Sequence, residues 1–248
     1  MKAALHAASA MARGPLWPLL AVSGVCWAAM AALVLAAPLV RICGGAARWA
    51  PLAPAIGWGG PDPHLVFDWL MLGAMMSPLV AHNLACVLRQ SLADRKGRAA
   101  GLFILGYLAP WTAALTALTV LAGLLARTLG DLAALSVVVG LGLLWQGAPL
   151  KGLALRGCHR TPSLPTFGAR AEVASLAYGA KTGAWCVAAC WLWMLAPLTW
   201  AAGHLWLSLA AFLVMLAERY GRPPPVRLRP TFIATGAAVV FLATSFRG

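Results

Sequence analysis

Residues 65–88 read LVFDWLMLGAMMSPLVAHNLACVL, and this stretch decides the class of fold. It is long enough to cross the hydrocarbon layer of a bilayer as one helix, which takes about 20 apolar residues. Apart from His82, its only acidic or basic residue is Asp68. A helix on the surface of a soluble protein would keep a charged or polar face, so this stretch predicts a transmembrane helix.

The whole chain has a composition of the same kind. Of its 248 residues, 62% are apolar and 10% are charged, whereas soluble domains have roughly 45–50% apolar and about 25% charged residues. The net charge of +13 raises the question of nucleic acid binding. The basic residues are scattered in short connectors between apolar runs, so we expect the lipid bilayer as a partner and no nucleic acid. Several of the six cysteines lie inside apolar runs and do not form a secreted disulfide framework.

Seven apolar runs predict an all-α fold, a polytopic transmembrane bundle of about seven helices. We place these runs at residues 16–40, 65–88, 101–125, 131–149, 177–199, 202–218 and 229–246. The sixth run is short, and merging it with the fifth as a tight helical hairpin would leave six helices. The prediction is a cytoplasmic segment over residues 1–15 and a single transmembrane domain over residues 16–246.

The distribution of basic residues predicts the orientation. With the N-terminus in the cytoplasm, 15 of the 19 Lys and Arg fall in cytoplasmic segments and four fall outside. Cytoplasmic loops of membrane proteins carry this excess of positive charge. We therefore expect a multi-pass protein of the bacterial inner membrane with its N-terminus inside and its C-terminus outside.

Two of the predicted spans carry sulfur ligands at about the same depth. Met71 and Met75 are four residues apart and share a helix face, and Met76 follows them. Cys186 and Cys190 have the same spacing in the fifth span. Thioethers and thiolates are the ligands that Cu(I) prefers. These five residues therefore predict a Cu(I) site near the middle of the bilayer.

Other candidates lie at the ends of the spans. Asp68 and His204 are near the outer ends of the second and sixth spans, where they could form an outer uptake point for the metal, and Glu218 is near the inner end of the sixth. Pro78 removes a backbone hydrogen bond and should kink the second span near Ala74. The cytoplasmic connector after the fourth span adds Lys151, Cys158 and His159, where we expect an exposed thiol in basic surroundings.

Each candidate also has a structural explanation. The methionines can be packing residues, and the cysteine pair can be small residues at a helix contact. Asp68 can snorkel to the interface, His204 can be an interfacial hydrogen-bonding group, and Glu218 can face cytoplasmic water. The connector can contact anionic lipid headgroups. Ligation of haem or chlorophyll by His82 or His204 is a further open alternative.

Four stretches in order resemble a bacterial family of predicted metal-binding integral membrane proteins, a domain of unknown function with a copper-chaperone-like label. The stretches are Trp69–Pro78, Gly106–Thr112, Pro149–Lys151 with Cys158, and Cys186–Trp191 followed by Gly203 and Glu218. Together they span about residues 65–220. The resemblance implies a divergent member, because Ala154 and Ala189 stand where the family has cysteines, and His204 or a neighbour stands where it has a methionine.

The leading hypothesis is a membrane protein that holds or hands over copper as Cu(I), with a copper-dependent enzyme as a possible recipient. The alternative is a non-enzymatic accessory or assembly subunit of a larger membrane complex, which the abundant Ala and Gly would suit. A transporter is disfavoured because few charges are buried and no inverted repeat is visible. We expect no enzyme, because the sequence shows no nucleophile triad, paired carboxylates or phosphate-binding glycine loop.

Overall fold

The computed structural model describes residues 17–35, 63–200, 203–220 and residue 235. These residues are helical or lie in short connectors, and no strand occurs among them, which confirms the all-α prediction. Contacts divide the chain into two compact units, Met1–Leu79 with Ala201–Gly221 and Val80–Trp200 with Arg222–Gly248. The single domain over residues 16–246 stays a prediction.

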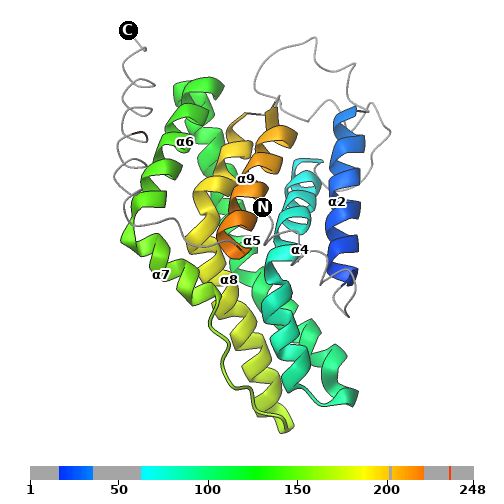
Figure 1. Cartoon of the computed structure of the whole chain (residues 1–248). Helices are drawn as coiled ribbons and strands as arrows, with labels where there is room; N and C mark the ends of the chain where they lie inside the picture. The colour runs from blue at the N-terminus through cyan, green and yellow to red at the C-terminus, as the bar shows by residue number, and fades with distance from the viewer. Residues whose placement is uncertain (1–16, 36–62, 201–202, 221–234, 236–248) are drawn as a thin grey trace. The chain divides into compact units, whose positions relative to one another are not determined.

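Among the described residues, the first unit contains three helical segments (Figure 1). They are α2, Trp17–Leu35, the part of α4, Pro63–Gln90, up to Leu79, and α9, His204–Tyr220. The rings of Trp27 on α2 and Phe212 on α9 lie 5.8 Å apart. Pro78 lies inside α4, one residue before the boundary between the units.

The second unit begins with the end of α4 and contains four further α-helices. After a short 3-10 turn, η1, Ala93–Arg95, these are α5, Lys96–Leu129, α6, Asp131–Gly147, α7, Pro149–Cys158, and α8, Gly168–Thr199. Gly130 separates α5 from α6 with a φ of 76°, a left-handed conformation that suits glycine, so the chain reverses within one residue.

Six of the seven predicted runs correspond to helices α2, α4, α5, α6, α8 and α9. The seventh run, 229–246, and the segment 1–15 lie outside the described residues. Four helical segments, starting at Trp17, Val66, Ala93 and Gly168, are long and apolar enough to cross a membrane, and the pair α6 and α7, bent by 78°, passes the same test together.

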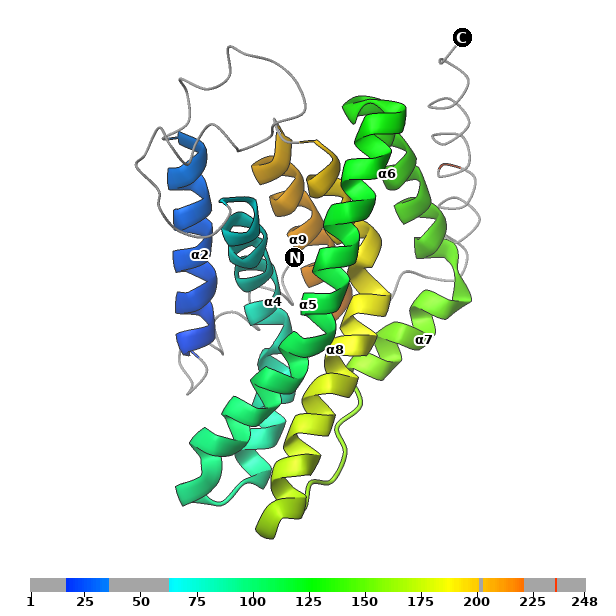
Figure 2. The same cartoon turned by 180° about the vertical axis from the view of Figure 1, so that it is seen from behind.

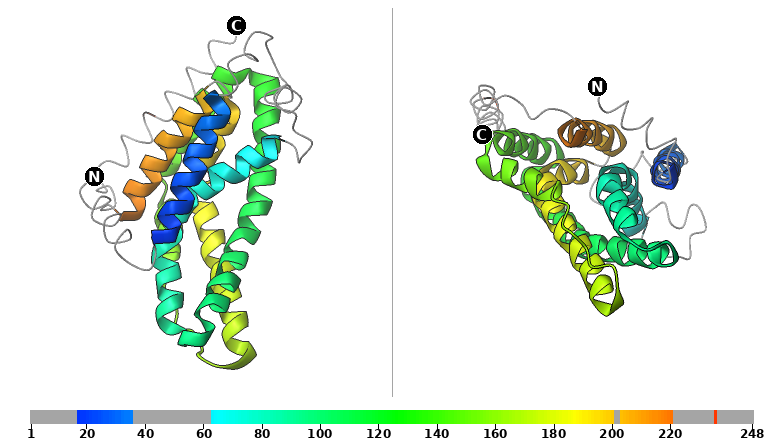
Figure 3. Two further views of the ribbon diagram at one scale, coloured as in Figure 1. Left: turned by 90° about the vertical axis from the view of Figure 1, so that its right-hand side faces the viewer. Right: turned by 60° about the horizontal axis from the view of Figure 1, so that its bottom comes forward.

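Helices α5 and α8 lie side by side (Figures 2 and 3). Gly106 of α5 faces the backbone of Leu176, and Gly179 of α8 faces the backbone of Phe103 so closely that a Cβ at either glycine would collide with a carbonyl group. Gly183 faces the carbonyl of Tyr107 in the same way. Small residues four apart allow two helix backbones to approach in this way, as in many membrane proteins.

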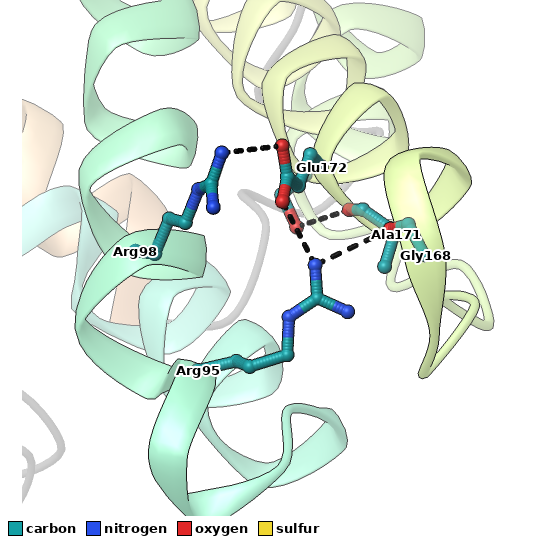
Figure 4. A network of polar contacts seen from close by, with 6 residues as sticks. Arg95, Arg98, Gly168, Ala171 and Glu172 are labelled. Atoms are coloured by element: carbon teal, nitrogen blue, oxygen red, sulfur yellow. Dashed lines mark hydrogen bonds and ion pairs between the residues drawn. The ribbon is translucent and has the colours of Figure 1, made fainter.

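Salt bridges join the starts of the same two helices (Figure 4). The carboxylate of Glu172 on α8 lies 2.9 Å from the guanidinium groups of both Arg95 and Arg98, and Arg95 also donates to the carbonyl of Gly168. Both helices begin before the apolar runs predicted for them. These charged ends are held together while the apolar runs follow further along each helix.

Candidate functional site

The cysteine pair lies on the buried face of α8. Cys186 and Cys190 are both buried, and neither forms a disulfide bond. They are one helical turn apart, so their side chains leave α8 on the same side. Two thiols in this arrangement can act as soft ligands to one ion once they lose their protons.

A tyrosine that we did not predict as a site residue contacts this pair. The hydroxyl of Tyr107 on α5 donates to Cys186 Sγ at 3.2 Å, and Tyr107 is buried. The close glycine packing between α5 and α8 brings its ring to this sulfur. The Gly106-Tyr107 motif was the available signal, but nothing in its spacing indicates a thiol as partner.

Methionines are concentrated in the first unit. Met71, Met75 and Met76 of α4 are 0%, 0% and 3% exposed. The structure adds Met30 of α2 and Met215 of α9, which are also buried. Each of the three helical segments of this unit therefore contributes at least one buried thioether.

The carbonyl that Pro78 leaves without a donor is bonded from another helix, while the kink of α4 stays a prediction. Proline has no N–H, so the carbonyl of Ala74 four residues earlier loses its donor within α4. Ser23 of α2 donates to that carbonyl at 2.6 Å. Tyr220 of α9 donates to the carbonyl of Pro78 at 2.7 Å. Both neighbouring helices of the unit therefore attach to α4 at its proline.

The polar candidate residues of the first unit are buried or half-buried. His204 is buried at the start of α9, and its ring meets the ring of Phe67 edge-on with centroids 4.7 Å apart. Asp68 is buried on α4, and Glu218 is half-buried near the end of α9. This unit brings His204 and the methionine-bearing part of α4 onto adjoining helices.

The expectation of an exposed Cys158 is wrong. Residues 149–158 form helix α7 and not a solvated loop, and Cys158 is buried, whereas His159 is exposed. Lys151 and Ala154 lie on the same buried face, while Leu150 and Leu153 point outward with 62% and 48% exposure. We assumed that a basic connector turns its charges to water. Lys151 does the reverse, whereas Arg156 on the same helix is exposed.

Side chains from α4 hold this connector in place. Asn83 donates to the carbonyl of Cys158 at 3.0 Å and to the hydroxyl of Tyr178 at 2.9 Å. Gln90 donates to the carbonyl of Pro162 and accepts from the N–H of Leu164. Gly157 faces the indole of Trp185, so α7 packs closely on α8.

The described part of the chain contains no group of three or more His, Cys, Asp and Glu side chains that could hold a metal ion. A metal site built from these residues therefore has to use two thiols, or methionine thioethers, or both. The family to which the chain is similar indicates which metal such a site could bind. The model of the PpoB2 family, described as a copper chaperone, matches residues 66–245.

The chain belongs to this family. The PpoB2 match begins within α4, so α2 lies before it. It covers the methionines of α4, the cysteine pair of α8, and α9. No curated protein and no solved structure matches the chain. The PpoB2 description supports a copper-related role and a non-catalytic one.

Two positions where the resemblance expects family cysteines are buried in this PpoB2 member. Ala154 on α7 is 2% exposed and Ala189 on α8 is 1% exposed. Both alanines lie on the same faces as buried cysteines, Ala154 with Cys158 and Ala189 with Cys186. The substitutions therefore change the number of thiols inside the protein and leave its surface unaffected.

Proposed function

We propose that this protein binds Cu(I) within a bacterial inner membrane and hands it to a copper-dependent protein. Cys186 and Cys190 hold the ion in this proposal, and the methionines Met71 and Met75 hold it before or after the cysteines. The observation that carries the proposal is the pair of buried cysteines one helical turn apart, with the Tyr107 hydroxyl on one sulfur, in a member of a copper chaperone family.

The chemistry of the pair suits a cargo that must be held and released. Two buried thiolates are costly in an apolar interior, and a bound cation offsets most of that cost. When Cu(I) binds, each thiol loses its proton and a Cu–S bond replaces the S–H bond. The Tyr107 hydroxyl donates to Cys186 Sγ, so it stabilises the sulfur in its negative form.

Apolar surface supports the location in the membrane. Large apolar side chains are exposed on most of the long helices, among them Val25 of α2, Leu105 and Val120 of α5, and Val173 of α8. Water does not favour such surfaces, whereas lipid does. Three of the four helical segments of spanning length, those that start at Trp17, Ala93 and Gly168, carry such side chains.

Metal analysis of the purified protein tests the proposal. The wild-type protein, expressed with copper and purified in detergent, is expected to contain stoichiometric copper. The Cys186→Ser, Cys190→Ser double variant is expected to lose the copper bound by the pair, and Cys86→Ser, which removes another buried thiol, is expected to lose none. A wild-type protein without copper, or a double variant that keeps all of it, contradicts the proposal.

One observation favours the alternative of an accessory subunit. Within the described residues, no three His, Cys, Asp and Glu side chains converge on a metal position. A subunit without metal would co-purify with a stable partner complex and would contain no copper in that complex. The same purification therefore separates the two functions.

A further inference from the structure

Helix α9 has its apolar residues on the outside and its polar and sulfur residues on the inside. His204, Ser208, Ala211 and Met215 are all buried, and their spacing of four, three and four residues puts them on one face. On the other side, Trp206 and Leu213 are 72% and 55% exposed. A helix in lipid has this arrangement when its inner face has a function beyond packing.

Helix α4 offers a matching face to α9. Phe67, Met71, Ala74 and Pro78 follow one another at the same spacing and are also buried. Two contacts join the helices, one at each end of this row: Phe67 with His204, and the Pro78 carbonyl with the Tyr220 hydroxyl. The two helices therefore run in the same direction, and the residues between these contacts face each other.

The helical rise gives the register between the contacts. Each residue advances about 1.5 Å along its helix, so Met71 lies level with Ser208, four residues after the Phe67–His204 contact on both helices. Met75 lies one turn further along α4. Met215 is 11 residues after His204 and Met75 is eight residues after Phe67, so Met215 lies about 4.5 Å further along, within reach of two long thioether side chains.

The buried hydroxyl of Ser208 indicates a ligand between α4 and α9. Ser77, Ser91, Ser136 and Ser175 each donate to the carbonyl four residues earlier in their own helix. Ser208 is fully buried and has no hydrogen-bond partner. A buried hydroxyl without a hydrogen-bond partner is unfavourable, and its presence is consistent with a ligand bound between α4 and α9.

We propose that the α4–α9 contact binds a Cu(I) ion of its own through Met71, Met75 and Met215, with His204 at the N-terminal end of the row and Ser208 beside the ion's path. This inference rests on the proposed function, because it takes Cu(I) as the cargo. The ligands are neutral, so this site needs no thiolate in an apolar interior and holds the ion with soft thioethers.

The proposal also divides the three methionines of α4. Met76 is three residues from Gly73, whose face meets Cys26 Sγ of α2, so Met76 lies on the side of α4 away from α9. Met76 is 3% exposed, as expected of a side chain that only packs. It is therefore a matched control for Met71, Met75 and Met215.

The experiment uses the full chain with Cys186→Ser and Cys190→Ser, in which only the α4–α9 site is left. Cu(I) is titrated against a coloured Cu(I) chelator in detergent. We expect one Cu(I) per chain, an affinity at least tenfold weaker after Met215→Leu, and no change after Met76→Leu. Leucine has nearly the volume of methionine, so thermal unfolding should show that both variants fold.

If a methionine variant fails to fold, NMR of the methionine methyl groups with Ag(I) as the probe tests the same site without any methionine substitution. The methyl signals of Met71, Met75 and Met215 should shift in the protein with native methionines, and the signal of Met76 should not. A cysteine double variant that binds no Cu(I), or equal responses of Met215 and Met76, overturns this site while the cysteine pair stands. Absence of Cu(I) from the wild-type protein would instead remove the proposed function itself.

Discussion

Ser23 donates to the carbonyl of Ala74 at 2.6 Å, and Ala74 is the residue whose carbonyl Pro78 leaves without a donor in its own helix. The proline thus creates an acceptor on α4, and the serine of α2 satisfies it. Both groups are buried, so neither can turn to water instead. This pair explains how α2, which lies before the family match, is fixed to a helix within it.

Ser23→Ala should destabilise the protein by about 1–3 kcal/mol, because it leaves the Ala74 carbonyl buried without a donor. Thermal unfolding in detergent measures the loss. Ser136→Ala is the control, since Ser136 donates only to the carbonyl of Leu132 in its own helix and is not buried. In a Pro78→Ala background the helix supplies its own N–H, and Ser23→Ala should then cost clearly less. Equal costs in the two backgrounds would contradict the pairing.

Gly179→Ala should destabilise the second unit, because its Cβ would collide with the backbone carbonyl of Phe103. Neither backbone can move without separating α5 from α8, so we expect a loss of about 1–3 kcal/mol, typical of overpacking. Gly123→Ala on α5 is the control, since its Cβ meets nothing within 4 Å. That control should be neutral or stabilising by about 0.5–1 kcal/mol, as expected for glycine inside a helix. Similar unfolding temperatures for both variants would refute the close contact.

The length of the apolar runs predicted the existence of six helices. A span needs a minimum apolar length, and a run of that length is recognisable even when it contains Gly or Pro. The burial of Lys151 and Cys158 could not be predicted in the same way. A short basic helix can turn its charged residues or its leucines inward, and only the packing of Gly157 on Trp185 decides between the two.

The candidate site shows the same limit. Periodicity put Cys186 with Cys190 and Met71 with Met75, because residues four apart share a face. It could not identify Tyr107 as the partner of Cys186. That relationship depends on a contact between helices that are distant in sequence.

Cys158 should react slowly with a maleimide in the folded protein, because it is buried and its carbonyl is held by Asn83. A cysteine introduced by His159→Cys should react at least tenfold faster, since position 159 is exposed. Mass spectrometry of the labelled peptides separates the two sites. Asn83→Ala removes the donor to both Cys158 and Tyr178 and should increase the rate at Cys158. Fast labelling of Cys158 in the wild-type protein would show that α7 does not hold it inside.

Tyr107→Phe should weaken Cu(I) binding by the cysteine pair while the fold is kept. The hydroxyl donates to Cys186 Sγ, and a hydrogen bond to a charged group contributes about 1.5–3 kcal/mol, which corresponds to an affinity loss of roughly tenfold or more. Competition with a Cu(I) chelator measures the affinity, and thermal unfolding of the metal-free protein measures the fold. Tyr178→Phe is the control, because its hydroxyl accepts from Asn83 and should leave the affinity unchanged. An equal loss in both variants would mean that Tyr107 acts through general packing and not through the sulfur of Cys186.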